Sequence, residues 1–466
     1  MENINKTDVL FIVHDVYQED NVFPLGIGYL SAILERHGYS VEIYCMDVYH
    51  YTNRDLKNKL EQNNYHIIGL GFLAARFKET ILDLCETINI YKKDAWLVLG
   101  GHCPSAIPEY ILEKTNCDIV VVGEGEEAIV DILISKKLGL LIEKQIIYTP
   151  IVENIDVLPY PAWHLFPMDI YTDNIKTIGM TEKDKAFPIV STRGCINRCT
   201  FCYRQTKGIR LRKIEDVIEE MKQLFNKYGV NVFLFQDELF LVSKTRLKSF
   251  IKRLKDNNLN IKYTVNARVD VIDEEIIVLL KESGCILLNI GFESSSQKVL
   301  DHMKKNTTVE QNIFVLKLCK KHKLGYGLNF IWGYPEDNKK SLMDNVKLIK
   351  KYNTYAQLRT IRPVTPYPIC ELYYEAIDKG LIDGPNDFFN KFINSDLITV
   401  NLTKYPDDIC YKWLLDANSE LIYDYYEHMA ELVIEQFHDL YNNKTISFRG
   451  VRHDTKEKNT CNSCTP

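Results

Sequence analysis

Short apolar runs alternate with amphipathic helical stretches along most of the 466-residue sequence, and this alternation limits the possible folds more than any other feature. The strand-like runs of the first 150 residues are Val9–Val13, Val41–Cys45, Ile67–Gly71, Trp96–Leu99 and Ile119–Val122. Continuous apolar strands that alternate with helices are typical of a parallel sheet covered on both faces. The sequence therefore predicts an α/β protein whose first domain, residues 1–149, is a doubly wound, Rossmann-like sheet.

A second α/β region follows a stretch that lacks the alternation of strands and helices. Residues 150–186 contain Pro159, Pro161 and Pro167 with little periodicity, which indicates a linker. Six strand–helix units then follow one another without a visible switch in strand order, which predicts a partial parallel (β/α)6 barrel over residues 187–366. Its strand-like runs are Phe187–Thr192, Val232–Gln236, Ile261–Asn266, Ile286–Gly291, Gly327–Trp332 and Ala356–Ile361.

The remaining chain divides into a helical segment and a tail. Residues 367–448 are predicted to be mostly helical and to cover the barrel, with one long helix from Ile409 to Tyr441. Residues 449–466 are polar and are expected to form a mobile tail.

Charge and hydropathy exclude two classes of partner. The formal charge of −6, from 57 basic and 63 acidic residues, offers no general attraction to nucleic acid. No apolar run approaches the roughly 18 residues that span a bilayer, and the N-terminus lacks the basic start and apolar stretch of a signal peptide. We therefore expect a cytoplasmic protein that binds neither nucleic acid nor membrane.

Cysteine is the one residue type whose spacing stands out. The chain has 13 cysteines, and without a targeting signal metal or catalytic use is commoner than disulfide bonding. Most lie singly in apolar runs and are interpreted as small core residues. Cys461 and Cys464 have metal-binding spacing but supply only two ligands near the end of a polar tail. We interpret them as part of a mobile tail or as a redox-sensitive pair.

The run S-T-R-G-C-I-N-R-C-T-F-C-Y-R directly follows the first barrel strand. Loops at the carboxyl ends of barrel strands form active sites, and this spacing lets one loop bring the thiolates of Cys195, Cys199 and Cys202 to a common centre. Thiolates are soft ligands that suit iron–sulfur clusters or zinc, and three ligands leave one metal position open for catalysis. Zinc would need a fourth nearby ligand, and no other Cys or His lies between His164 and Cys285.

The pattern C-x3-C-x-aromatic-C, here with Phe201 before the third cysteine, resembles the radical S-adenosylmethionine superfamily. The resemblance implies that Cys195, Cys199 and Cys202 hold a [4Fe–4S] cluster, near which Phe201 lies, and that S-adenosylmethionine chelates the fourth iron. Reductive cleavage would then yield methionine and a 5′-deoxyadenosyl radical that abstracts hydrogen. The resemblance further implies an electron donor such as flavodoxin or ferredoxin and a small-molecule or peptide substrate. The catalytic residues beyond the cofactor ligands stay unidentified.

Later strand ends carry segments that fit the same resemblance. F-Q-D-E-L-F is similar to the segment that accepts hydrogen bonds from the methionine amino group, which implies Asp237 and Glu238. N-A-R-V-D ends the third strand and contributes Arg268 as a cofactor-binding candidate. G-F-E-S-S-S-Q-K-V-L resembles the segment that contacts ribose and methionine, which implies Glu293 and Ser294.

The segments at the ends of the last two barrel strands depart from the usual sequence motifs of the family. W-G-Y-P-E-D, at residues 332–337, resembles the segment that flanks adenine but lacks its second glycine. Ile369-Cys370 stands where Gly-Thr is usual. These departures affect the adenine wall and the substrate rim, not the cluster.

Three glycine-containing segments of the first domain are predicted at strand-to-helix turns. Glycine permits close approach of a ligand, and ligands of such sheets bind outside the carboxyl ends of the strands. In combination the segments resemble the cobalamin-binding domain that precedes many radical S-adenosylmethionine barrels, over roughly residues 8–135. The implied cofactor-binding residues are Gly26, Gly28, Gly100, Gly101, Gly123 and Glu124.

The motif D-x-H-x-x-G, which supplies a histidine to cobalt in other cobalamin proteins, is absent, and His14 and His102 do not fit it. The resemblance therefore implies cobalt without a protein histidine ligand, while a degenerate domain that binds no corrin stays open. The leading hypothesis is a cobalamin-dependent radical C-methyltransferase. The alternatives are a cobalamin-associated cyclase, rearrangement or oxidation enzyme, and a non-catalytic corrinoid-binding protein, which has no use for the cysteine triad.

Overall fold

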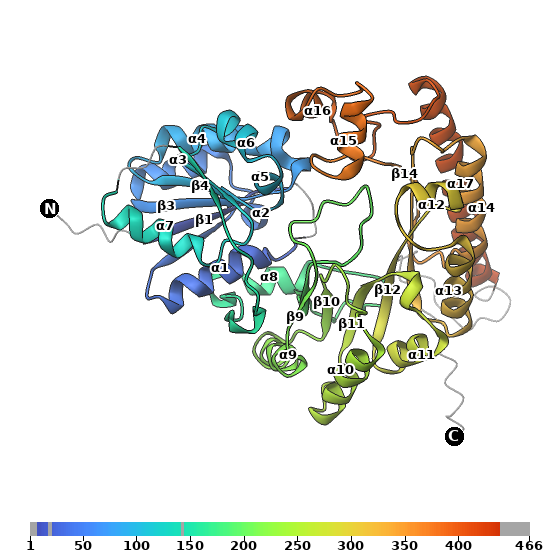
Figure 1. Ribbon diagram of the computed structural model, residues 1–466. Helices are drawn as coiled ribbons and strands as arrows, with labels where there is room; N and C mark the ends of the chain where they lie inside the picture. The colour runs from blue at the N-terminus through green and yellow to red at the C-terminus, as the bar shows by residue number, and fades with distance from the viewer. Residues whose placement is uncertain (1–6, 17–20, 141–143, 439–466) are drawn as a thin grey trace.

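Two parallel sheets of six strands each organise the chain in the computed structural model, which describes residues 7–16, 21–140 and 144–438 (Figure 1). Cys461 and Cys464 lie outside the described residues. Within the described part of the chain, no helix is long and apolar enough to cross a membrane.

The N-terminal sheet has the order β2-β1-β3-β4-β5-β6, and every pair of neighbouring strands is parallel. Strand order reverses between β1 and β3, which confirms the predicted doubly wound topology and creates a switch point at the carboxyl ends. Edge strand β6 was not predicted, because its half-exposed residues form no continuous buried run. The strands are β1 (Thr7–Val13), β2 (Val41–Cys45), β3 (Tyr65–Gly71), β4 (Trp96–Gly100), β5 (Ile119–Val122) and β6 (Gln145–Tyr148).

Helices cover both faces of this sheet. Val9 and Phe11 of β1 pack under α1 and α7, whereas Leu10 and Ile12 pack against α3, α4 and α6. Burial on both faces explains why the strands read as continuous apolar runs. The helices of this domain are α1 (Leu25–Arg36), α2 (Met46–Tyr49), α3 (Asn53–Gln62), α4 (Leu82–Tyr91), α5 (His102–Ala106), α6 (Pro108–Thr115) and α7 (Ala128–Lys137), with a 3₁₀ turn at Ala74–Arg76 and a π turn at Phe77–Ile81.

The linker is a packed joint between the two sheets. It contains 3₁₀ turns at Ile155–Val157 and Trp163–Leu165 and helix α8 (Met168–Asp173). The Phe23 ring of the N-terminal domain lies 4.6 Å from the ring of Phe166 and 4.7 Å from that of Phe187 in the first barrel strand. One aromatic cluster therefore joins the first domain, the linker and the barrel.

The second sheet has the sequential order β7-β10-β11-β12-β13-β14, all parallel, and curls into a half-barrel (Figure 1). This confirms the predicted partial barrel. The sixth strand is displaced from the predicted run Ala356–Ile361, because the backbone of Ile361 bonds the Asn418 side chain at 2.8 and 3.1 Å instead of β13. The strands are β7 (Ala186–Ile189), β10 (Val232–Phe235), β11 (Lys262–Ala267), β12 (Cys285–Glu293), β13 (Gly325–Trp332) and β14 (Arg362–Pro363).

The convex face of the half-barrel packs against the helices that connect its strands. The first of them, α9, ends at Gly229, whose φ of 73° is the left-handed conformation that stops a helix. The barrel helices are α9 (Ile214–Tyr228), α10 (Lys244–Asp256), α11 (Glu274–Glu282), α12 (Gln297–His302), α13 (Val309–Lys321) and α14 (Lys339–Tyr352), with a 3₁₀ turn at Val269–Val271; α17 (Asp407–His438) packs on α14.

Residues 370–392, which we call the C-terminal cap, bridge the barrel and the N-terminal domain (Figure 1). The cap contains α15 (Glu371–Asp378) and α16 (Pro385–Lys391). The Phe389 ring lies 4.8 Å from the ring of Phe77 and 5.7 Å from that of Tyr110, which it stacks upon. The cap therefore shares its core with the first domain.

Replacing Phe389 with alanine is expected to loosen the cap. Phe389 is 2% exposed, and deleting a buried aromatic ring costs about 3–5 kcal/mol. Hydrogen–deuterium exchange should show faster exchange in the cap and in α6 than in the wild type. Tyr374→Ala, on the same cap but 51% exposed, is the matched control. Unchanged exchange in the cap of the Phe389 variant would contradict this packing.

Candidate functional site

Residues 192–211, which we call the cysteine loop, follow the carboxyl end of β7. Antiparallel pairing of β8 (Thr192–Arg193) with β9 (Arg210–Leu211) closes its base. Gly194 has a φ of 89°, and a Cβ there would lie 2.5 Å from the Gly208 carbonyl oxygen, so the tight turn before the first cysteine requires glycine. The loop therefore begins at the strand end where the sequence placed it.

The cysteine loop carries thiols that differ from the rest. Cys195 and Cys199 are half-buried and Cys202 is exposed, whereas every other described cysteine is buried. Asn197 Nδ2 donates to Cys195 Sγ at 3.3 Å, and Arg268 Nη1 lies 3.8 Å from Cys199 Sγ. Among the described residues, no three Cys, His, Asp or Glu side chains are already arranged to hold a metal ion.

The donor set nevertheless fits an iron–sulfur cluster. Burial raises the pKa of Cys199, but the charges of Lys305 and Arg268 oppose that effect and favour the thiolate. Burial also raises the pKa of Cys202 to about 11, with Lys305 again opposing. Three accessible thiols on one loop beside two cations match the thiolate ligation that such clusters require.

Asp237 and Glu238, both predicted to contact the cofactor, face in different directions. Asp237 is fully buried, and its Oδ1 accepts from the backbone N–H groups of Ser191 at 2.6 Å and Thr192 at 3.0 Å, while the Ser191 hydroxyl bonds Oδ2. Burial raises the pKa of Asp237 to about 6. The Asp237 carboxyl thus braces the base of the cysteine loop, and only Glu238 is exposed.

Glu293 and Lys305 form a buried ion pair beside the cysteine loop. Glu293 Oε1 lies 2.7 Å from Lys305 Nζ, and the Lys305 carbonyl accepts from Arg268. A Cβ at Gly291 would lie 2.1 Å from Glu293 Oε1, so glycine makes room for the carboxylate. Lys305 Nζ also lies 5.9 Å from the centre of the Phe201 ring. Sequence reasoning missed Lys305, because it belongs to no strand-end segment.

Ser294 lies inside the turn that leads into α12. Its side chain is fully buried, and its Oγ accepts from the Ser296 N–H at 3.1 Å. The Ser294 hydroxyl is therefore bonded within its own turn, and the structure does not place it on the ion pair of Glu293 and Lys305.

Four glycines, which we call the glycine edge, lie at the carboxyl ends of β3, β4 and β5: Gly71, Gly100, Gly101 and Gly123. Gly71 and Gly100 pair at the ends of β3 and β4, and the exposed Gly101, with a φ of 89°, directly precedes α5. Gly123 follows β5 with a φ of 105°, and a Cβ there would lie 2.6 Å from Thr149 Oγ1. Gly123 therefore makes room for Thr149, whereas the exposed Gly101 leaves its position at the end of β4 without a side chain that could block a ligand.

The sequence predicted that Gly26 and Gly28 lie in a strand-to-helix turn, and this prediction is wrong. Both glycines lie inside α1, which begins at Leu25. A Cβ on Gly28 would lie 2.9 Å from the Phe23 ring and from Pro161 Cβ, so this glycine serves the packing of the linker. Gly26 is exposed, with open space around it.

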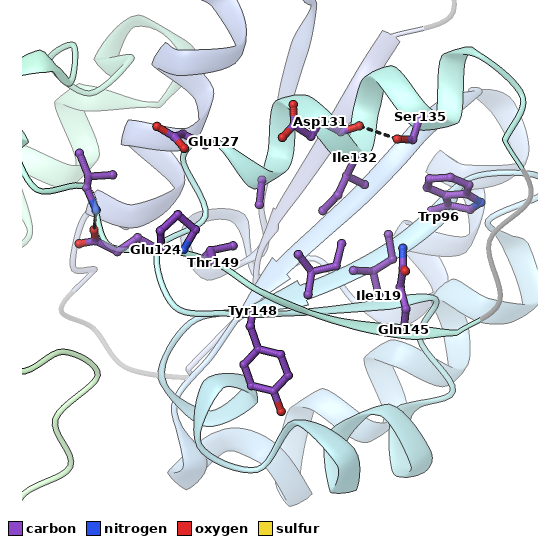
Figure 2. Close-up of a pocket in the computed structure, with 14 residues that line it drawn as sticks. Trp96, Ile119, Glu124, Glu127, Asp131, Ile132, Ser135, Gln145, Tyr148 and Thr149 are labelled. Carbon is purple, nitrogen blue, oxygen red and sulfur yellow. Dashed lines mark hydrogen bonds between the residues drawn. The ribbon is translucent and has the colours of Figure 1, made fainter.

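A cavity of about 240 Å³ opens between α7 and strands β5 and β6 (Figure 2). Its lining combines apolar side chains of the sheet and helix with polar groups near its ends. At about 240 Å³ this hollow is too small for a whole corrinoid, but it has room for part of the extended tail, while the flat ring would lie outside it, at the glycine edge. The lining residues include Trp96, Ile119, Glu124, Glu127, Asp131, Ile132, Ser135, Gln145, Tyr148 and Thr149.

Glu124 is committed to a contact with the cysteine loop. Arg210 binds both of its carboxylate oxygens at 2.6 and 2.9 Å, and Arg193 Nη1 lies 2.9 Å from Oε1. The Val152 N–H also donates to it at 2.6 Å. Despite burial, the two guanidinium groups hold the pKa of Glu124 below its usual value. The predicted cofactor-binding carboxylate is thus engaged by two arginines.

His302, at the end of α12, joins the 332–337 segment to the C-terminal cap. Its Nδ1 lies 2.8 Å from Glu336, and its Nε2 lies 2.8 Å from Glu375 of α15. Burial opposes the charged form, but the two carboxylates outweigh it and raise the pKa of His302 above its ordinary value. The imidazolium therefore acts as a bridge that sequence reasoning did not identify.

Comparisons with known proteins agree with this geometry. The sequence matches the Radical SAM superfamily over residues 189–349 and the B12 binding domain over residues 16–133. It is 30% identical to an uncharacterized methyltransferase of Pyrococcus horikoshii, covering 77% of this chain and 79% of that one. An anaerobic magnesium-protoporphyrin IX monomethyl ester cyclase of Rubrivivax gelatinosus is 25% identical, over 76% of this chain and 66% of that one.

The fold also resembles a solved structure, the radical S-adenosylmethionine methyltransferase TsrM of Kitasatospora setae with cobalamin and a [4Fe–4S] cluster bound. The TM-score is 0.64 at 17% identity, covering 80% of this chain and 75% of that one. The two domain matches imply S-adenosylmethionine, an iron–sulfur cluster and cobalamin as the cofactors of this chain.

Glu293→Gln is expected to weaken S-adenosylmethionine binding while iron content stays unchanged. A lost hydrogen bond to a charged group lowers affinity roughly ten- to a hundredfold. The variant also leaves Lys305 buried without its counter-charge, which costs about 3 kcal/mol of stability. Anaerobic equilibrium dialysis and thermal unfolding test both effects, with the exposed Glu310→Gln as control. Wild-type affinity would show that Glu293 does not contact the ligand.

The His302 bridge predicts a pH-dependent cap. Because its folded pKa is raised, the bridge contributes its full stability below the unfolded pKa of about 6.5 and loses it as pH rises through the folded value. Limited proteolysis of the cap should therefore be faster at alkaline pH. His302→Gln should lose this pH dependence, whereas His164→Gln, at an exposed histidine, should keep it. A wild-type cap with pH-independent cleavage would refute the bridge.

Proposed function

The chain belongs to the radical S-adenosylmethionine superfamily, among the members that also carry a B12 binding domain, and from this premise we propose that it is a cobalamin-dependent C-methyltransferase. When bound, the cluster and S-adenosylmethionine supply a hydrogen-abstracting radical and cobalamin supplies a methyl group. The protein has to place both beside one unactivated carbon and keep water out.

The observation that carries the proposal is the contact between the cysteine loop and the glycine edge of the N-terminal domain. The Gln205 side chain of the loop donates to the Gly123 carbonyl at 2.5 Å, and the Tyr203 ring lies edge-on to His102 at 5.5 Å. The candidate cluster ligands and the candidate corrinoid edge are therefore immediate neighbours. A methyl transfer that needs both cofactors at one substrate requires such proximity.

A row of polar side chains crosses the sheet of the half-barrel. Asn266, Asn289 and Asn329 form a ladder across β11, β12 and β13, with N–O distances of 3.1 and 2.9 Å. Asn289 is exposed although it lies mid-strand, and a Cβ on Gly327 would lie 2.5 Å from its Oδ1. We infer that this concave face receives polar groups of the substrate, whether a small molecule or a peptide.

A cyclase or other radical oxidation is the second candidate, because the Rubrivivax gelatinosus cyclase is similar over 76% of the chain. The two functions differ in how S-adenosylmethionine is consumed. Methylation uses one molecule for the radical and a second to restore the methyl donor, so 5′-deoxyadenosine and S-adenosylhomocysteine form in equal amounts. A cyclase forms the first product without the second.

We expect the reconstituted protein, supplied with a reductant such as flavodoxin and with hydroxocobalamin, to form both products from S-adenosylmethionine. The reduced corrinoid, which carries no methyl group at the start, would accept one and leave S-adenosylhomocysteine, and reductive cleavage would leave 5′-deoxyadenosine. Replacing Cys195, Cys199 and Cys202 together with alanine should abolish both products. The absorbance of thiolate-bound iron at about 400 nm should be lost as well, while the circular dichroism spectrum stays unchanged. Cys461→Ala with Cys464→Ala is the matched control and should keep full iron content. 5′-Deoxyadenosine without S-adenosylhomocysteine would favour the cyclase, and cleavage by the triple variant would refute both.

A further inference from the structure

The cysteine loop is fastened to the N-terminal domain next to its cysteines. Gln205 Nε2 donates to the Gly123 carbonyl at 2.5 Å and lies 3.5 Å from Ser105 Oγ, which itself accepts from the Gly123 N–H at 3.1 Å. Ser105 belongs to α5, which begins at His102, directly after Gly101. One amide side chain thus ties together the two glycine turns that follow β4 and β5.

Tyr203 adds a second contact at the same place. It directly follows Cys202, and its ring meets the exposed imidazole of His102 edge-on, with 5.5 Å between ring centres. Tyr203 and Gln205 therefore lie between the last cysteine and the glycine edge.

The base of the loop is fastened as well. Arg193 and Arg210 both bind Glu124, and Arg193 also lies 2.7 Å from Glu126. The side chains of Arg210 and Glu124 are each only 9% exposed. The segment that carries all three cysteines is consequently held at both ends on one surface of the N-terminal domain.

We propose that Gln205 and Tyr203 are positioning residues that make cluster loading and corrinoid binding mutually reinforcing; this rests on the corrinoid site of the proposed function. Binding three thiolates to one cluster restricts the loop between its fastened ends. The contacts of Tyr203 and Gln205 with the glycine turns then form at a smaller entropic cost, and they hold those turns in place for the corrinoid. Coupling of binding free energies is reciprocal, so the corrinoid favours cluster loading by the same factor.

The test measures hydroxocobalamin affinity by anaerobic equilibrium dialysis, for reconstituted protein and for the same protein after iron removal. We expect the cluster to tighten binding about tenfold in the wild type. Gln205→Ala should reduce this ratio to below about threefold, and so should Gln205→Glu, which keeps the shape but loses the N–H donor. Tyr203→Phe keeps the ring contact and should retain most of the ratio. Gln223→Ala, an exposed glutamine on α9, is the matched control.

The ratio separates positioning from simple packing, because a merely structural contact would weaken both forms equally. Equal affinities of loaded and iron-free wild type, or a Gln205→Ala protein with the tenfold ratio, would overturn the proposal. The reciprocal measurement is iron bound at limiting iron, which hydroxocobalamin should increase in the wild type but not in Gln205→Ala. A protein that shows the ratio but transfers no methyl group would refute the proposed function alone, and one that takes up no corrinoid would refute both.

Discussion

The ion pairs between Glu124 and the two arginines at the base of the cysteine loop hold the two halves of the site together. Each partner is largely removed from water, so the charges depend on one another, and breaking a buried pair by removing one member typically costs 3–5 kcal/mol. Because Arg193 and Arg210 form the closing strands β8 and β9, this contact orients the whole loop. Docking the base of the loop there accompanies the contacts of Tyr203 and Gln205 with the glycine edge of the N-terminal sheet.

The N-terminal domain, the barrel and the C-terminal cap share hydrophobic cores around this contact. One core runs from Phe23 through the linker into the barrel, and a second includes the N-terminal sheet, α12 and the C-terminal cap. Such shared cores resist the relative motion that small polar interfaces between domains permit. The His302 bridge and the Thr200 carbonyl, which accepts from Leu372 of the cap at 2.9 Å, tie the cap to the cysteine loop as well. The cap is therefore anchored both to the N-terminal domain and to the cysteine loop.

The candidate cofactor residues divide into those beside the cysteines and those behind the cysteine loop. Glu293 and Arg268 gather beside Cys199 with the unforeseen Lys305, and Glu238 is exposed nearby. Asp237, by contrast, supports the loop from below. Residues that belong to one motif thus serve two purposes, because a strand end sends successive side chains to opposite faces.

The sequence by itself determined the α/β alternation, the order of the two domains, the cysteine triad and the glycine turns after β4 and β5. All of these are signals of local spacing, which lie within one strand, one helix or one turn and need no knowledge of distant residues. The edge strand β6 was not predicted because it lacks a run of buried apolar residues. The sixth barrel strand lies after its predicted position because the backbone N–H of Ile361 donates to the Asn418 side chain. Only the tertiary structure decided which side chains meet. Glu124 pairs with arginines 69 and 86 residues away, and Gly28 makes room for Pro161 instead of a ligand. Such contacts depend on how two sheets pack, and no local pattern encodes that packing.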